Sequence, residues 1–482
     1  MKAGVPNMAG VMRKGPHSTF PATAHSSLAG LAWPGLASQL STHLMALLYQ
    51  LEQSQWWTAG QLSRHQLRQL APLVQHALNT VPHYREHRRA WGIGGKWKLT
   101  AQSFAASLPI LTRAEAQERG AALHAASLPK GHGETGDIFT SGSTGRPLRT
   151  LKTGLAEIMW QAVTLREFLW HRDLRLKLAV ITMDEDEQAG YPDGAQYENW
   201  SAIAAQTFVT GPSCVLHVST KIHQQVEWLL RMKPDYLFTR AGNAQALAQH
   251  CLRENIEFPF LRQVITFSDL LRSEARAVCR EAWGVPVVDM YSAAEVGYIA
   301  LQCPDSENYH IQSESVYVEI LDEAGRRCAP GEVGQVIVTP LHNFAMPLLR
   351  YASGDLAEVG ECACGRCLPA LRRIIGRTRS VLALPNGEHV FPELQDLLID
   401  LPMVRQFQIL RRERESLDVK LVVARELTEG EAALLERELQ TRFHYPFRLK
   451  ISYHDELARS PSGKFHDFKD VYGGGDGDGD GG

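Results

Sequence analysis

The apolar run Val285-Pro286-Val287-Val288-Asp289-Met290 is the last of three strand-like segments that alternate with helix-like segments in residues 222–290. Each helix-like segment has apolar residues at three- and four-residue spacing and precedes a short run of β-branched or aromatic residues. The helix-like segments are 226–231, 244–252 and 271–283, and the strand-like runs that follow them are 236–238, 264–267 and 285–290. Such alternation is typical of a mostly parallel sheet with helices on both faces. We therefore expect an α/β fold.

The flanking sequence predicts two domains of unequal size. Helical patterns cover residues 38–86 and 155–169, and residues 178–183 are typical of a buried strand. Strands separated by Gly-rich turns follow in residues 316–341. Beyond residue 377 strand and helix patterns start again. We expect a large N-terminal domain over residues 26–376, with mostly parallel sheets flanked by helices plus a small β subdomain. A small mobile α+β C-terminal domain is expected over residues 377–472.

Composition limits the class of protein. Residues 1–25 mix Gly, Pro, Ser and His without periodicity, and residues 473–482 contain only Gly and Asp, so both ends are expected to be disordered. A net charge of −3 gives no reason to expect nucleic acid as a partner. The sequence has no run of 18 apolar residues and no recognisable secretory signal, so no membrane span is expected. Eight cysteines in 482 residues do not indicate a disulfide scaffold, and a cytoplasmic location with reduced thiols is expected.

A small-residue loop follows the strand-like Asp137-Ile138-Phe139 and reads Thr140-Ser141-Gly142-Ser143-Thr144-Gly145-Arg146-Pro147. Its glycines let the backbone approach a phosphate closely, and successive N–H groups and hydroxyls can donate to it. By itself such a cluster is equally typical of a flexible linker. A second loop, residues 291–297, follows the strand-like run 285–290. It would lie at the carboxyl end of a parallel strand, where open α/β sheets bind ligands.

Five motifs in a fixed order carry a family resemblance. The loop at residues 140–147 is followed by Tyr291-Ser292-Ala293-Ala294-Glu295-Val296-Gly297, Arg350-Tyr351-Ala352-Ser353-Gly354-Asp355, Gly376-Arg377-Thr378-Arg379-Ser380 and Arg459-Ser460-Pro461-Ser462-Gly463-Lys464. Over residues 40–470, approximately, the chain resembles the acyl-adenylate-forming superfamily of acyl-CoA synthetases, luciferases and peptide-synthetase adenylation domains. Three more segments are similar to its phenylacetate–CoA ligase branch, and more narrowly to ligase-like proteins of capsule biosynthesis loci: Val81-Pro82-His83-Tyr84-Arg85, Leu108-Pro109-Ile110-Leu111-Thr112 and Cys362-Ala363-Cys364-Gly365-Arg366.

The resemblance implies ATP and Mg²⁺ as ligands and assigns roles to residues. A hard cation needs oxygen ligands, and a carboxylate can accept hydrogen bonds from two ribose hydroxyls. A flexible ammonium can bridge the reacting carboxylate and the α-phosphate. By resemblance, Thr140, Ser141, Gly142, Ser143, Thr144 and Gly145 would hold pyrophosphate, Tyr291 would stack on adenine, Glu295 would bind Mg²⁺, Asp355 and Arg377 would contact ribose, Arg379 would be the hinge, and Lys464 would be the mobile lysine of the small domain.

The sequence departs from the family pattern at three places. The family usually has Thr or Ser before the glutamate, whereas this chain has Ala294. Phe267-Ser268-Asp269 replaces a glycine-rich segment, and Arg379 stands where the family often has an aspartate, although some members use a basic residue. Adenine packing against residues 267–269 therefore stays open.

The cysteines suggest a separate site. Tetrahedral Zn²⁺ takes four nitrogen or sulfur ligands, often as two close pairs from different segments. Five candidates exist for four places, and we favour Cys303, His310, Cys362 and Cys364, with Cys367 as a substitute. Such a site would be closed and structural. The alternative is a set of ordinary reduced thiols in a turn.

The resulting hypothesis is an AMP-forming carboxylate ligase. ATP and a small carboxylate would give an acyl-adenylate and pyrophosphate, and CoA is the expected acceptor once the small domain has rotated. An amine or a carrier protein is an alternative acceptor, because the chain has no strong CoA signature. A non-catalytic nucleotide-binding relative is the rival from another class. Ala294 and residues 267–269 favour it slightly, whereas Lys464, Glu295 and Asp355 argue against it.

Overall fold

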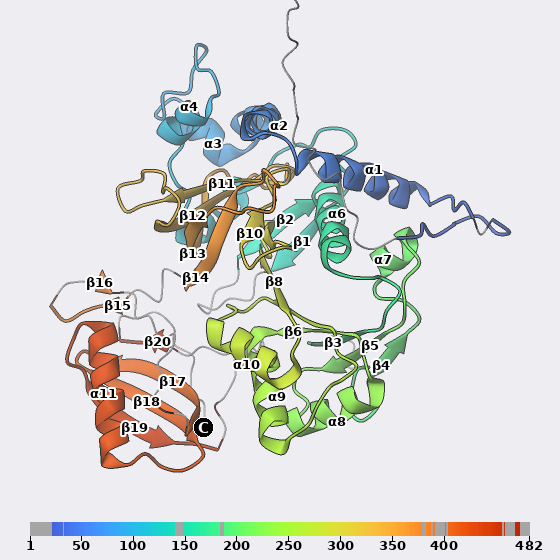
Figure 1. Ribbon diagram of the computed structural model, residues 1–482. Coiled ribbons are helices and arrows are strands. Elements are labelled where there is room, and N and C mark those ends of the chain that lie inside the picture. Colours follow the sequence, from blue (N-terminus) through green and yellow to red (C-terminus); the bar gives the residue numbers. More distant parts are fainter. Residues whose placement is uncertain are drawn as a thin grey trace, which may run out of the picture.

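The larger part of the molecule is organised around a single mixed β-sheet (Figure 1). The structure is a computed structural model that describes residues 22–31, 33–139, 148–183, 188–377, 382–386, 389–390, 401, 403–455, 457 and 468–472. The strands of this sheet lie in the order β11-β12-β13-β14-β10-β9-β8-β7-β6-β3-β5-β4. The half from β8 to β5 is parallel, with β4 added antiparallel at its edge, and the half from β8 to β11 is antiparallel.

The strands of this sheet are β3 (Leu178–Thr182), β4 (Ala195–Tyr197), β5 (Ser213–His217), β6 (Tyr236–Arg240), β7 (Gln263–Phe267), β8 (Val287–Ala293), β9 (Gly297–Gln302), β10 (Tyr309–Ile311), β11 (Val316–Leu321), β12 (Val333–Pro340), β13 (Tyr351–Gly360) and β14 (Ala370–Arg377). A separate antiparallel hairpin consists of β1 (Thr135–Phe139) and β2 (Arg149–Thr153).

Helices cover both faces of the sheet. In this part of the chain they are α1 (Gln39–Ser54), α2 (Ala59–Thr80), α3 (Pro82–His87), α4 (Ala101–Ser107), α5 (Arg113–Arg119), α6 (Gly154–His171), α7 (Ala202–Thr207), α8 (Ile222–Met232), α9 (Ala241–Glu254) and α10 (Ser273–Trp283), with a 3-10 turn at Gly120–Leu123.

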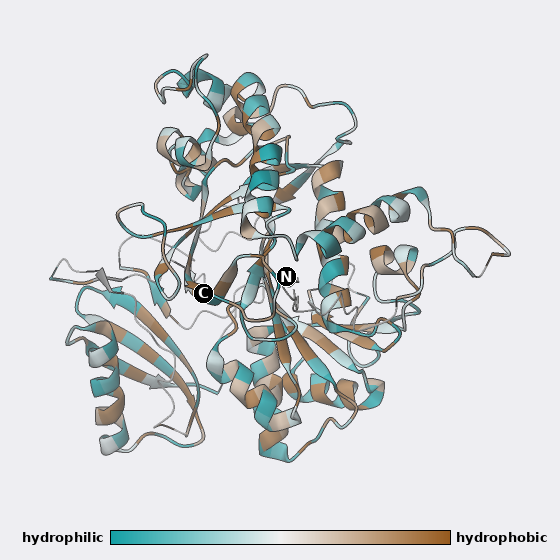
Figure 2. Cartoon of the chain, turned by 45° about the horizontal axis from the view of Figure 1, so that its top comes forward, coloured by the Kyte–Doolittle hydropathy of each residue, from teal (hydrophilic) through white to brown (hydrophobic). Residues whose placement is uncertain are grey.

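Alternate residues of β3 show how the two faces are filled. Leu178 belongs to an apolar cluster with α1, α6 and α7, whereas Ala179 and Ile181 belong to a second cluster with α8, α9 and α10. A third cluster joins α2 to α5 with the antiparallel half of the sheet. Parallel strands that are buried on both faces are apolar along most of their length, and those of this sheet are mainly brown in Figure 2.

The C-terminal part has its own sheet and core. Strands β17 (Val404–Glu413), β18 (Ser416–Val423), β19 (Arg448–Tyr453) and β20 (Phe468–Asp470) form a sheet in the order β19-β18-β17-β20, covered by α11 (Glu429–Phe443). A small two-stranded sheet, β15 (Leu382–Ala383) with β16 (His389–Val390), precedes it. Figure 1 shows this part beside the larger one. The apolar cluster that includes Leu417, Leu435 and Phe443 contains only residues beyond 383.

The predicted α/β fold is confirmed, with two differences. The β subdomain expected over residues 316–341 is not a separate sheet, because pairing of β8 with β9 joins the parallel and antiparallel halves. Residues 23–25, expected to be disordered, hydrogen-bond to residues 207–209 through an antiparallel bridge at Ala24 and Phe208. Backbone groups paired in this way hold the segment in place. Residues 1–21 and 473–482 lie outside the described residues. Among the helices that the structure describes, none has the length and hydropathy to cross a bilayer.

Candidate active site and metal centre

The predicted adenine and ribose residues are in direct contact. Tyr291 lies in β8, and its hydroxyl donates a hydrogen bond of 2.6 Å to Asp355 Oδ2 in β13. The backbone N–H of Asp355 donates to Ser353 Oγ at 3.2 Å, and the backbone of Asp355 lies opposite that of Arg377 in the ladder between β13 and β14. Two motifs separated by about sixty residues thus meet at one place, as the family resemblance implies.

Glu295 lies in the turn between β8 and β9 and is buried, with 5% of its surface exposed. Arg113 Nη1 and the hydroxyl of Tyr351 each donate to its Oε1 at 2.9 Å. The guanidinium neutralises the buried carboxylate, and the geometry orients it. Burial next to this carboxylate raises the pKa of Tyr351 far above its usual value, so the hydroxyl stays a donor.

Sequence reasoning missed Arg113 and Tyr351 as partners of Glu295. Both nevertheless lie in or next to motifs that carry the family resemblance. Residue 111 forms a parallel bridge with Tyr351, so the segment 108–112 lies along the start of β13 and α5 begins at Arg113, beside Glu295. Thr112 caps α5, because its side chain accepts from the N–H of Glu115. The signal in the sequence was the position of Arg113, a charged residue directly after the motif at residues 108–112.

Arg350, in the motif at residues 350–355, supports the segment that precedes α5. Its side chain is buried, and Nε donates to Glu319 Oε2 at 2.9 Å. Nη1 donates to the carbonyl oxygens of Ala105 and Leu108 at 2.7 and 2.6 Å. Arg350 therefore holds the end of α4 against β11 and thereby positions the segment that carries Arg113.

A turn at residues 267–269 stands where the family usually has a glycine-rich segment. Ser268 has a φ of 68°, a left-handed conformation that glycine adopts most easily. Arg240 Nη1 donates to Ser268 Oγ at 3.1 Å and to Asp269 Oδ1 at 3.3 Å. The ring of Phe267 stacks on Phe238 with centroids 4.4 Å apart. Side-chain contacts thus support a positive φ at a residue that is not glycine.

Several predicted site residues lie outside the described residues. They are Thr140, Ser141, Gly142, Ser143, Thr144, Gly145, Arg379 and Lys464, and for Arg377 only the backbone is described. The structure does define the ends of the 140–147 loop. Residue 139 pairs with residue 149, so the loop connects the two strands of the β1–β2 hairpin. The roles predicted for residues 140–145, Arg379 and Lys464 stay predictions.

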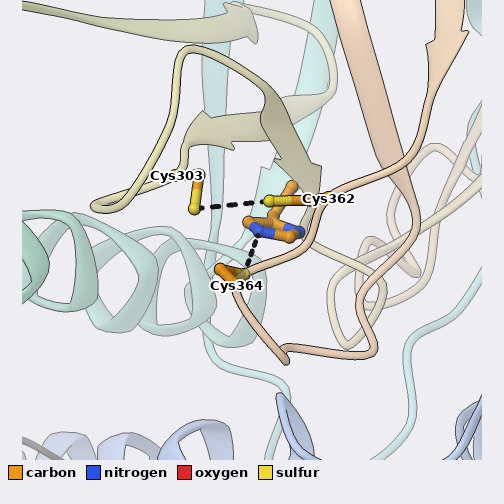
Figure 3. A group of neighbouring side chains, drawn as sticks. Cys303, Cys362 and Cys364 are labelled. Atoms are coloured by element: carbon orange, nitrogen blue, oxygen red, sulfur yellow. Dashed lines mark hydrogen bonds between the residues drawn. The ribbon is translucent and has the colours of Figure 1, made fainter.

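The four favoured metal ligands come together. Ligand atoms of Cys303, His310, Cys362 and Cys364 all lie within 4.8 Å of one another, and Figure 3 shows the three cysteines around a common centre. Cys303 follows β9 and His310 lies in β10, whereas the other two lie in the turn between β13 and β14. Cys367 is partly exposed, and its Sγ contacts the carbonyl of Gly365 instead. The predicted substitute is therefore not part of the cluster.

The spacing and donor set of this cluster fit a tetrahedral zinc ion. With Zn–S bonds of about 2.3 Å and Zn–N bonds of about 2.0 Å, tetrahedral geometry places two sulfurs about 3.8 Å apart, and sulfur and nitrogen about 3.5 Å apart. The Cys303 and Cys362 sulfurs are 3.7 Å apart, and His310 Nε2 lies 3.2 Å from Cys364 Sγ. All eight cysteines of the chain are free, so none of these sulfurs is in a disulfide.

The surroundings of the cluster also suit a metal. Burial lowers the pKa of His310 to about 4, so the imidazole is neutral at pH 7, and its Nδ1 lies 3.2 Å from the Leu368 carbonyl. An Nδ1–H bonded to that carbonyl leaves Nε2 as the ligand atom. Burial raises the pKa of Cys303 to about 12, because the buried thiolate is poorly solvated. Coordination of the thiolate to a metal would offset this cost of ionisation. Arg366, whose pKa is raised partly by Asp305 and Cys364, places a positive charge beside the thiols.

Comparison with known proteins agrees with the family motifs. No family model matches the chain. Phenylacetate-coenzyme A ligase of Pseudomonas putida is 23% identical over 405 residues, which are 78% of this chain and 86% of that protein. The enzyme of the same name from Thermus thermophilus is 27% identical over 205 residues, 40% of this chain and 46% of that protein, so this match spans less than half of that relative.

Solved structures show the same fold. A 2-hydroxyisobutyryl-CoA ligase in the postadenylation state, bound to its acyl-AMP, aligns with a TM-score of 0.67 and 19% identity over 86% of this chain and 91% of that one. An anthranilate CoA ligase bound to anthranoyl-AMP aligns with a TM-score of 0.51 and 17% identity over 70% and 68% of the two chains. The chain is thus similar in sequence to phenylacetate-coenzyme A ligases, and it has the fold of CoA ligases solved with acyl-AMP bound.

Proposed function

We propose that the protein is an AMP-forming carboxylate–CoA ligase. In the first half-reaction a carboxylate oxygen attacks the α-phosphorus of ATP, and pyrophosphate leaves. In the second, the sulfur of CoA attacks the acyl carbon of the adenylate, AMP leaves and the thiol proton is released. The observation that carries the proposal is the clamped carboxylate Glu295, adjacent in the fold to the Tyr291–Asp355 pair.

The described residues supply two of the functions that adenylation needs. Glu295, oriented by Arg113 and Tyr351, is an oxygen ligand suited to Mg²⁺, which would neutralise charge on the phosphates. Asp355 is held at 2.6 Å by Tyr291 and can accept hydrogen bonds from both ribose hydroxyls. The predicted pyrophosphate loop and Lys464 would complete the site, with Arg379 as the hinge for the change of half-reaction.

We also propose that Cys303, His310, Cys362 and Cys364 hold a structural Zn²⁺. A closed four-ligand set has no open position for catalysis, so the ion would tie the loop after β9 to the β13–β14 turn. The three thiols of this ligand set must stay reduced to bind zinc, which is the state that a reducing compartment maintains. We therefore propose that the protein works in the cytoplasm, with a carboxylate, ATP and CoA as partners.

A panel of carboxylates tests the proposed reaction. ATP-dependent pyrophosphate release, with hydroxylamine to trap the acyl-adenylate, is measured for the wild type and for Glu295→Gln and Asp355→Asn. Loss of a preorganised electrostatic contact costs about 10²–10³-fold in rate, so both variants should fall by that factor. Glu323→Gln, an exposed carboxylate in the turn after β11, is the matched control and should keep full activity.

The same assay separates the alternatives. Parallel reactions with CoA, amines and a carrier protein identify the acceptor. ATP binding without pyrophosphate release from any acid in the panel would favour the non-catalytic relative. Unchanged pyrophosphate release from both folded variants would refute the site assignment.

A further inference from the structure

A small cavity lies directly beside the clamped carboxylate. It is a partly open pocket of about 30 Å³ between β2, α6, the start of β9 and the segment after β12. Val296 and Gly297, the two residues after Glu295, form part of its wall. The indole of Trp160 on α6 forms another part, and a Cβ at Gly297 would lie 3.5 Å from that ring. The cavity is therefore adjacent in the chain to the residue proposed to hold Mg²⁺.

Lys152 of β2 is the unusual residue of this cavity. It is 94% buried, since only 6% of its surface is exposed, and no described residue hydrogen-bonds its Nζ. Its ammonium lies 4.2 Å from the centroid of the Trp160 ring. Burial lowers its pKa to about 8, against the opposing charges of Glu157 and Glu295. The side chain is thus mostly protonated at pH 7, with three N–H donors and an aromatic face as its neighbour.

Two more polar atoms in the cavity wall are buried without a partner among the described residues. They are Ser315 Oγ and His342 Nδ1. Burial lowers the pKa of His342 to about 4, so this ring is neutral at pH 7. Buried polar atoms in folded proteins almost always have partners, and an unpaired buried charge is the most costly exception. Three such atoms around one cavity indicate that it receives a polar group.

We propose, resting on the proposed function, that this cavity binds the far end of the acyl group and that Lys152 selects acids with a second oxygen acceptor, an anionic one above all. The remaining wall is largely apolar, from Met159, Val163 and Val316, and suits the carbon skeleton. A pocket of about 30 Å³ has room for a substituent of the size of a carboxylate or hydroxyl. The substrate class is a small dicarboxylic, hydroxy or keto acid.

Lys152→Met tests the selection, because it removes the ammonium and keeps a chain of similar length. Pyrophosphate release is measured for matched acids: butyrate with succinate, and phenylacetate with its 4-hydroxy and 4-carboxy derivatives. The wild type should have a kcat/KM at least about tenfold higher for the acceptor-bearing member of each pair, as expected for a hydrogen bond to a charged group. Lys152→Met should lose this preference, so that the two members of each pair react with similar kcat/KM. Lys130→Met, an exposed lysine, is the control that should keep it.

Two results would overturn the proposal. An equal loss of kcat/KM with both members of each pair would mean that Lys152 acts on the reacting carboxylate or the phosphates. An unchanged preference in Lys152→Met would mean that it does not contact the acid. Calorimetric titration of the same acids in the presence of ATP separates this inference from the proposed function. A preference in binding that Lys152→Met removes, without pyrophosphate release, refutes the ligase and supports the selection.

Discussion

Replacing one thiol of the cysteine–histidine cluster is the sharpest test of the metal centre. Cys362→Ser exchanges a sulfur that lies 3.7 Å from Cys303 Sγ, close to the edge of about 3.8 Å in a tetrahedral zinc–thiolate site. A serine oxygen is a poor Zn²⁺ ligand at neutral pH and its shorter bond does not span the same distance. The variant is therefore expected to retain three ligands and to lose most of its zinc.

The expected size of the effect follows from the energy of structural zinc sites. Binding of about 10–16 kcal/mol shared among four ligands gives roughly 3 kcal/mol for one of them. Because the metal joins the loop after β9 to the β13–β14 turn, this energy contributes to the stability of the larger part. For a domain of this size we expect the Tm to fall by about 6 °C, on the order of 2 °C for each kcal/mol.

Elemental analysis and thermal unfolding measure both quantities. Wild-type protein purified without chelator should carry about one Zn²⁺ per chain, and chelation should lower its Tm at least as far as Cys362→Ser does, because chelation removes all four metal bonds. Cys367→Ser is the matched control, since Cys367 lies in the same turn but outside the cluster, and it should keep the metal. Well-folded wild type without zinc, or equal zinc loss from both variants, would refute the reasoning.

Three other predictions concern the site and the core. Tyr351→Phe removes a donor to Glu295, so adenylation should fall roughly tenfold or more and need more Mg²⁺, as titration of pyrophosphate release against Mg²⁺ would measure; an unchanged Mg²⁺ requirement contradicts the clamp. Lys464→Ala should abolish adenylate formation yet let supplied acyl-adenylate react with CoA, and equal loss in both half-reactions would contradict a mobile role. Burial raises the pKa of Asp289 to about 6, so the folded state binds this proton more tightly and the group's contribution to stability falls as pH rises from about 4 to about 6. Asp289→Asn should remove that fall, roughly 3 kcal/mol, and identical slopes of unfolding free energy against pH in the two proteins would refute it.

Features that depend on residues close together in the sequence could be predicted from the sequence alone. The alternation in residues 222–290 predicts the parallel half of the sheet, because the periods of buried strands and amphipathic helices are local properties. Two close pairs of ligand-type residues predicted the cluster of three cysteines and one histidine. In each pair the chain itself keeps the two ligands near each other, so only one long-range approach was needed.

The partners of buried polar groups were decided by the tertiary structure. Arg113 and Glu295 are 182 residues apart, and the sequence around either residue does not predict that the other is its partner. They meet because the segment before α5 lies along the start of β13, and Tyr351 at the start of β13 contacts Glu295 in the β8–β9 turn. The buried Lys152 was equally invisible, since a lysine in a strand is usually exposed. A polar side chain pairs with whichever distant segment the packing of the fold brings within about 3 Å of it. The local periodicity of the sequence does not indicate which segment that is.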